Sequence, residues 1–389
     1  MTDSTLKIKI GILAASTLIM VPVGLVGIIP GLIAHYAAGV TMIQIAFTLA
    51  TVMSIPSLLI IGSQSAKTGK KPPLLIGICL IFVFGMIPFL FDITLPVFMV
   101  VMAVIGIGIG CVMSMSTGLI TDHFQGAEQG ALMGKQSAFV NVGGMTLAFL
   151  GGLLIVNGWM NVFLVFLYTI PIFIICLLCI PKDKKQVVAG DANAERPKIK
   201  LSAEVYIMCV MIIVITVATL GVANTNSAIL VGERALGGDA VANFATSIMT
   251  GTGIVTGLLY GVFAKFLKNN ILPFALIVFA CGMIIMGNAV NVWMFYLGNM
   301  AAGVGLTLTM PTGVFRCAQS VEGPSATFAV SVFFSANMLG MFLSPLLMNP
   351  ISMAIADGSA QSRYNIGFVV AVLIGIWMLV HVRRTAPKA

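Results

Sequence analysis

The sequence has very little charge. Only 8% of its 389 residues are Asp, Glu, Lys or Arg, and 59% are hydrophobic. A water-soluble globular chain carries about 25% charged residues, so this chain has too few polar side chains to cover a soluble surface. The mean hydropathy of +1.10 indicates the same thing. We therefore expect a protein whose solvent is lipid.

Acidic side chains are missing from the interior of the apolar runs. All twelve Asp and Glu residues lie in loops or near the ends of these runs, and so do His35, His123 and His381. Proton relays in membranes usually use an intramembrane Asp, Glu or His. Proton coupling therefore cannot be assigned to a buried carboxylate. The nearest alternatives are Glu204, Asp122 and the cation Arg316, although a role as an interfacial charge or cap is the more common one for such residues.

Chemistry-bearing clusters are also missing. The seven cysteines lie in or at the ends of apolar runs, so no disulfide framework is expected, and Cys176-x-x-Cys179 is expected to pack rather than bind a metal. We find no metal triad, no nucleophile–base pair and no phosphate loop. The sequence therefore predicts no enzyme activity, no cofactor, no metal and no nucleic-acid partner.

Long apolar runs dominate what is present. A helix needs about 20 apolar residues to cross the hydrocarbon core of a bilayer. Twelve runs qualify, at roughly 10–34, 40–62, 73–91, 95–119, 133–157, 160–180, 204–228, 240–264, 271–290, 292–316, 325–348 and 364–382. They lack the period-two alternation of barrel strands, so we expect helices. The first run is too long for a typical signal peptide, and we expect it to be retained.

The basic residues predict the topology. If both termini face the cytoplasm, eighteen of the twenty Lys and Arg residues lie on that side, and only Arg234 and Arg363 lie outside. This is a strong positive-inside bias. We expect a multi-pass protein of the cytoplasmic membrane with both termini cytoplasmic.

The two halves of the chain repeat one pattern. Gly62 and Gly261, Gly106 and Gly303, and Thr117 and Thr312 match at offsets of 199, 197 and 195 residues. A polar stretch with nine charged residues, 181–202, separates the halves. The sequence predicts a six-helix bundle over 1–180, a cytoplasmic linker over 181–203 and a second six-helix bundle over 204–389. Such repeats place a site between the halves, which rock to give alternating access.

The loop after the second run carries the clearest motif. It has Gly62, Ser65, Ala66, Lys67, Gly69, Lys70 and Lys71. With twelve runs and a central linker, it resembles the conserved loop of the major facilitator superfamily, except that Ala66 stands where that family has Asp. The segments 28–49, 122–144 and 340–347 resemble the family's drug:proton antiporter branch. Two departures are Met102, where the family has Arg, and Leu147-Ala148, where the antiporter motif has Gly-Pro.

The resemblance implies a twelve-helix, all-α major facilitator fold and a transport function. The loop, with Gly62, Lys67, Gly69, Lys70 and Lys71, is either a topology anchor that binds anionic headgroups or a conformational latch weakened by the missing Asp. The helices that line the family's cavity carry uncharged polar residues and flexible methionines here, which suit varied neutral ligands. The candidate substrate-binding residues are Thr17, Met20, Gln44, Met113, Asn141, Asn224, Asn226, Asn299, Met310 and Asn337. Interhelical hydrogen bonding and plain packing are the alternative roles of each.

Three functions remain open. The first is a secondary transporter, working as an exporter, for amphipathic or lipophilic small molecules, with protons as the candidate coupling ion. The second is a facilitator or symporter for a defined metabolite such as an organic anion, which the missing acid and the altered motif favour. The third is a transport-inactive receptor or scaffold. We expect a monomer whose partners are the lipid bilayer and a small-molecule substrate.

Overall fold

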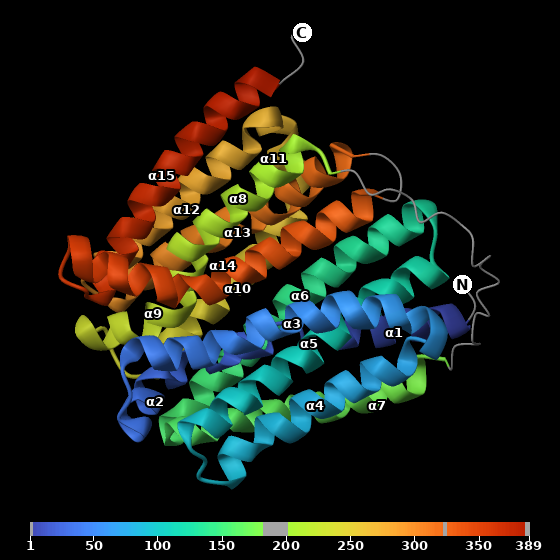
Figure 1. Ribbon diagram of the computed structural model, residues 1–389, viewed down its shortest axis with the longest axis horizontal. Helices are drawn as coiled ribbons and strands as arrows, with labels where there is room; N and C mark the ends of the chain where they lie inside the picture. The colour runs from blue at the N-terminus through green and yellow to red at the C-terminus, as the bar shows by residue number, and fades with distance from the viewer. Residues whose placement is uncertain (1–2, 182–200, 322–324, 386–389) are drawn as a thin grey trace. The chain divides into compact units, whose positions relative to one another are not determined.

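All regular structure that the chain shows over residues 3–181, 201–321 and 325–385, the part described by this computed structural model, is helical (Figure 1). The chain divides into two compact units, Met1–Ala194 and Glu195–Ala389. Helices satisfy every backbone hydrogen bond within one segment, which is why apolar runs of this length form them in lipid. The all-helical membrane fold predicted from the sequence is confirmed.

Unit 1 contains the helical segments that run from the blue to the green part of Figure 1. They are α1 (Asp3–Ser16), the 3₁₀ helix η1 (Val21–Ile28), α2 (Ile29–Tyr36), α3 (Val40–Thr68), α4 (Lys71–Leu90), α5 (Leu95–His123), α6 (Gly126–Leu154), the 3₁₀ helices η2 (Ile155–Asn157) and η3 (Trp159–Tyr168), and α7 (Thr169–Cys179).

Unit 2 contains α8 (Ala203–Ala218), α9 (Leu220–Glu233), α10 (Ala240–Leu258), α11 (Tyr260–Leu267), the 3₁₀ turn η4 (Lys268–Asn270), α12 (Ile271–Gly287), α13 (Val292–Gln319), α14 (Ser325–Ile355) and α15 (Ala360–Thr385). The start of α15 is capped. Ser362 N donates to Ser359 Oγ at 3.1 Å, and Ser359 N and Oγ donate to Asp357 Oδ1 at 3.0 and 2.7 Å. The hydrogen bonds from Ser359 hold the pKa of Asp357 below its usual value.

Eleven helical runs among the described residues are long and apolar enough to cross a membrane. The eighth predicted run is not among them, because α10 carries several polar side chains, including the buried Asn243, Thr246 and Thr250. At 1.5 Å per residue its 19 residues still span about 28 Å, close to the ~30 Å of a hydrocarbon core. With α10 included, the described part of the chain has twelve helical segments of membrane-spanning length, the number predicted.

Close helix contacts occur at matching positions in the two units. A Cβ added to Gly106 of α5 would lie 2.1 Å from Ala50 O of α3, and one added to Gly303 of α13 would lie 2.3 Å from Met249 O of α10. Two residues further on, a Cβ on Gly108 or Gly305 would lie 2.7 Å from Gly77 O or Ala275 O, respectively. Only glycine permits backbones this close. The repeated glycines of the sequence therefore occupy corresponding contacts within each unit.

The first membrane segment of each unit is interrupted. In unit 1, α1 ends at Ser16 and η1 begins at Val21; in unit 2, α8 ends at Ala218 and α9 begins at Leu220. Thr219, between α8 and α9, has φ −124° and ψ −76°, and the nearby Val217 O accepts a hydrogen bond from Ser344 Oγ at 2.7 Å. Non-helical backbone at membrane depth is tolerated where protein covers it or where it lines a cavity.

Candidate functional site

The predicted substrate-binding residues of unit 1 lie on different helical segments and differ in their contacts. Thr17 lies in the helix interruption, is 4% exposed, and accepts a hydrogen bond from Tyr168 OH at 3.2 Å while donating to Ala14 O at 2.7 Å. Gln44 on α3 is fully buried. Asn141 on α6 is half-buried and its Nδ2 donates to Ser137 O of its own helix at 3.3 Å. Met20 and Met113 are half-buried.

The predicted asparagines of unit 2 make hydrogen bonds within that unit. Asn337 Nδ2 on α14 donates to Thr216 Oγ1 on α8 at 2.8 Å, and Asn299 Nδ2 donates to Phe295 O at 2.9 Å. Asn224 Nδ2 lies 3.9 Å from Met341 Sδ. Asn337 is linked to a cavity through its partner Thr216, which lines one.

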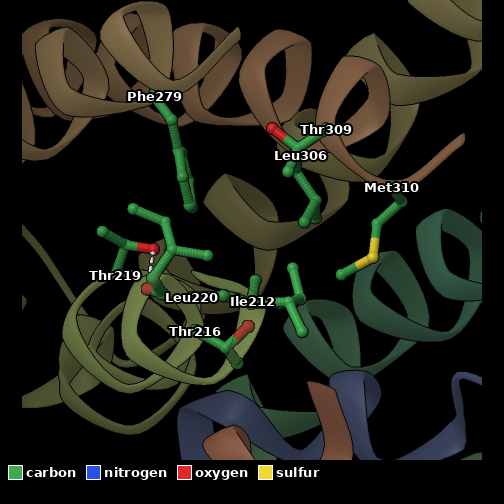
Figure 2. A pocket seen from close by; sticks show the side chains of 9 residues that line it. Ile212, Thr216, Thr219, Leu220, Phe279, Leu306, Thr309 and Met310 are labelled. Atoms are coloured by element: carbon green, nitrogen blue, oxygen red, sulfur yellow. Dashed lines mark hydrogen bonds between the residues drawn. The ribbon is translucent and has the colours of Figure 1, made fainter. Parts of the chain in front are cut away.

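A small cavity, with a volume of about 10 Å³, lies beside the α8–α9 interruption (Figure 2). Its lining comes from α8 and α9 with the interruption, α12 and α13, and consists of Ile212, Ile215, Thr216, Thr219, Leu220, Phe279, Leu306, Thr309 and Met310. None of these residues is charged. Pockets for small ligands usually measure ~300–1,000 Å³. This cavity has room for only about one water molecule, so it would have to open widely to admit a substrate.

The hydroxyl groups of the cavity have fixed roles. Thr219 Oγ1 donates to Ile215 O and Thr309 Oγ1 donates to Gly305 O, which leaves their lone pairs as acceptors. Thr216 Oγ1 already accepts from Asn337. The cavity therefore combines an apolar wall with a few neutral polar groups, an arrangement typical of small-molecule sites.

The loop between α3 and α4 places two of its lysines, Lys70 and Lys71, near helix ends within unit 1. Gly69 has φ +81°, a conformation that favours glycine. Lys70 Nζ lies 2.6 Å from Asp122 Oδ2 and also donates to Gly118 O at the end of α5. Lys71 Nζ donates to Leu177 O at 2.7 Å and to Ile180 O, at the end of α7. Cations at helix C-termini are stabilising. Gly62 lies within α3, and the side chains of Ala66 and Lys67 lie outside the described residues.

The other two coupling candidates, Glu204 and Arg316, meet at one end of unit 2. Arg316 Nη1 lies 3.1 Å from Glu204 Oε1, and His381 Nε2 lies 2.9 Å from Glu204 Oε2. The meeting of these three residues cannot be predicted from the sequence, since they lie on the separate helices α8, α13 and α15. Because Arg316 already faces a carboxylate, a substrate anion would have to compete with Glu204 for it.

Sequence reasoning missed the role of Arg363. It was counted as an outer loop charge, yet its side chain sits on α15 and is only 4% exposed. Its Nη1 donates to Asn226 Oδ1 at 2.6 Å, Nη2 to Gly358 O at 2.8 Å and Nε to Ser352 Oγ at 3.3 Å. Asn226 in turn donates to Val222 O at 3.1 Å. The predicted substrate residue Asn226 is thereby engaged in joining α9 to α15.

Solved structures share this fold. A mutant of the nucleoside transporter NupG has a TM-score of 0.75 at 12% identity, with 96% of this chain and 99% of that chain covered. The xylose transporter XylE from E. coli, in a partially occluded inward-open conformation, has a TM-score of 0.72 at 16% identity, covering 99% and 98%. A bacterial homolog of the human lysosomal transporter Spinster, inward-facing and unoccupied, has a TM-score of 0.76 at 12% identity, covering 98% and 96%. At these identities the likeness concerns the fold alone.

Sequence comparison identifies the family. No curated protein matches the chain significantly. The family profile described as Major Facilitator Superfamily matches residues 11–221, which is more than half of the chain. The chain therefore belongs to the Major Facilitator Superfamily, a family of membrane transporters.

Proposed function

We propose that this protein is a secondary transporter that carries uncharged or weakly charged amphipathic small molecules across the cytoplasmic membrane by alternating access. The observation that carries the proposal is the uncharged cavity beside Thr219, with its apolar wall and threonine hydroxyls. Burying an unpaired charge in such surroundings is costly, whereas an apolar molecule with a few polar groups fits them. The cavity adjoins an interrupted helix, as substrate sites of secondary transporters often do.

Two features of the sequence support the proposed direction of transport and the proposed membrane topology. The resemblance of segments 28–49, 122–144 and 340–347 to drug:proton antiporters favours export. The distribution of Lys and Arg favours a cytoplasmic location for both termini. In this orientation Lys70, Asp122, Glu204 and Arg316 lie at the cytoplasmic ends of their helices.

A second function has support of its own. The proteins of similar fold include a nucleoside transporter and a xylose transporter, which favours a defined metabolite carried by facilitation or symport. If that metabolite is an organic anion, Arg316 is the cation most suited to hold it. The contact between Arg316 and Glu204 counts against this reading, because the guanidinium is already engaged.

The test is substrate exchange in liposomes that contain the purified protein. Neutral, cationic and anionic small molecules of similar size are offered in turn. We expect exchange of neutral and weakly cationic compounds, and a severalfold loss of it in Met310→Ala, which enlarges the cavity and removes part of its apolar wall. Met300→Ala is the matched control, since Met300 lies on the same helix but is 43% exposed and does not line the cavity. Equal losses in both variants would refute the assignment of the cavity.

A further inference from the structure

A short basic segment lies at one end of unit 2, where α11 (Tyr260–Leu267) and η4 (Lys268–Asn270) connect α10 to α12. It carries Lys265 and Lys268, and both side chains are exposed. At 1.5 Å per residue, the chain from the start of α10 to the end of α11 reaches up to about 42 Å. This exceeds the ~30 Å of a hydrocarbon core, so we expect the two lysines in the headgroup layer.

The two faces of α11 have different surroundings. One face packs against the start of α12. On the other face Val262 is 51% exposed and Phe266 80%, and Leu258, at the end of α10, is 77% exposed. Leu258, Val262 and Lys265 follow the i, i+4, i+7 spacing of a single helix face. An exposed apolar stripe therefore leads directly to a lysine, as in side chains that extend from hydrocarbon to the membrane surface.

The corresponding loop of unit 1 uses its lysine differently. Lys70 and Lys268 match at an offset of 198 residues. In unit 1, Lys70 Nζ lies 2.6 Å from Asp122 Oδ2 at the end of α5. The offset of 195 residues that relates the ends of α5 and α13 places Cys317 where unit 1 has Asp122. Unit 2 thus keeps the lysine and lacks the carboxylate that pairs with it.

The protein supplies no substitute anion among the described residues. There, neither Lys265 nor Lys268 makes an ion pair or a side-chain hydrogen bond, and the sequence from 240 to 321 contains no acid. At this end of unit 2, the acid within the described part of the chain is Glu204, whose two oxygens already meet other side chains. The two lysines therefore have unbalanced charge at the membrane surface.

Further cations lie beside this segment. η4 packs against α15, and the last turn of α15 carries Arg383 and Arg384, both exposed. Together with Lys265 and Lys268 they make four exposed cations on neighbouring elements at one end of unit 2. Clusters of about four to eight Lys or Arg at a membrane surface are typical of sites for anionic lipids.

We propose that α11 and η4, with the end of α15, bind the headgroup of an anionic phospholipid such as phosphatidylglycerol. The acyl chains of this lipid lie along Leu258, Val262 and Phe266, and its phosphate provides for Lys268 the negative charge that Asp122 provides for Lys70 in unit 1. In the topology proposed above, the lipid belongs to the cytoplasmic leaflet. Binding of this lipid does not require transport, so the transport function is tested separately.

Quenching by brominated lipids measures which lipid contacts a chosen tryptophan. In the full chain, Trp159, Trp293 and Trp377 are replaced by phenylalanine, and Phe266→Trp introduces a reporter next to Lys265. The protein is placed in phosphatidylcholine vesicles that contain a minor fraction of either brominated phosphatidylglycerol or brominated phosphatidylcholine. The control chain has phenylalanine at the other two positions, retains Trp293 and keeps Phe266. Trp293 is 73% exposed and lies at the opposite end of unit 2.

We expect phosphatidylglycerol to quench the Phe266→Trp reporter with an affinity about fivefold that of phosphatidylcholine, and Trp293 to show no such preference. Changing Lys265→Gln and Lys268→Gln together should remove most of the preference, whereas Lys135→Gln, at an exposed lysine of α6, should leave it intact. Added salt should weaken it, because salt screens exposed charges.

Three results would overturn the proposal. They are equal quenching of the Phe266→Trp reporter by the two lipids, an equal preference for phosphatidylglycerol at Trp293, and a preference that survives the loss of both lysines. The comparison of the two reporters leaves every charged residue in place, so it tests the site even if the double lysine variant inserts poorly.

Discussion

The close backbone contact between α10 and α13 gives a direct test of the packing of unit 2. In Gly303→Ala, the new Cβ would lie 2.3 Å from Met249 O, whereas ordinary van der Waals contact begins at 3.4 Å. The helices α13 and α10 must therefore separate by about 1.1 Å. The obstacle is backbone of another helix, so no side-chain rotation can relieve it. Overpacking of this kind costs about 1–3 kcal/mol.

Replacing glycine by alanine in a helix also stabilises it, and a control variant measures this effect separately. Alanine is favoured over glycine in a helix by about 1 kcal/mol. In Gly257→Ala on α10, the new Cβ would meet only Thr307 Cγ2 at 3.6 Å, so this variant reports the helix propensity without the clash. We expect Gly257→Ala to match or exceed the native chain in stability and Gly303→Ala to fall below it.

The assay is thermal unfolding of the purified protein in detergent. A change of 1 kcal/mol shifts the Tm of a unit of this size by about 2–4 °C, so the two variants should differ by several degrees. Gly106→Ala, whose Cβ would lie 2.1 Å from Ala50 O in unit 1, should behave like Gly303→Ala. Equal Tm values for Gly303→Ala and Gly257→Ala would refute the close approach of α10 and α13.

Three further predictions concern charged groups. Lys71→Met removes a cation from the end of α7 and should cost about 0.3–2 kcal/mol, seen as a lower Tm than that of Lys135→Met, which changes an exposed lysine of α6. Arg363→Ala leaves buried acceptors on α9 and α14 without their donor and should cost several times more than Arg383→Ala at the exposed end of the same helix; similar losses would show that the buried contacts contribute nothing. The pKa of Asp357 is lowered in the folded protein, so its hydrogen bonds stabilise α15 fully above the ordinary carboxyl pKa. This stabilisation is lost as the pH falls through the lowered pKa of the folded state. The difference in stability between the native chain and Asp357→Asn should therefore be constant near neutral pH and shrink only in acid.

The sequence predicts the helices because a bilayer demands long apolar runs. It also locates the close contacts, since Gly106 and Gly303 recur at one offset and only glycine allows backbones to meet there. The interruption at Thr219 could not be predicted, because no proline marks it and the nearby Gly221 is one of many glycines in the apolar runs. The adjoining Val217 O accepts a hydrogen bond from Ser344 of α14, 127 residues away in the chain.

The polar clusters could be predicted only in part. Glu204 and Arg316 stood out as single charges at helix ends, but their meeting with His381 depends on the rotation and packing of three helices. Arg363 directly precedes the last predicted apolar run, 364–382, but lies in the first turn of α15, and hydropathy does not tell which face of a helix is buried. Such contacts depend on tertiary packing, which a single sequence does not specify.

Exchange of matched compounds in liposomes tests the central claim most directly. A neutral amphipathic compound and its carboxylate analogue are offered to the native chain and to Arg316→Gln. We predict that the native chain exchanges the neutral compound much faster than the anion, and that Arg316→Gln does not reverse this preference. Exchange of the anion alone, abolished by Arg316→Gln, would contradict the account and identify the protein as an organic-anion transporter.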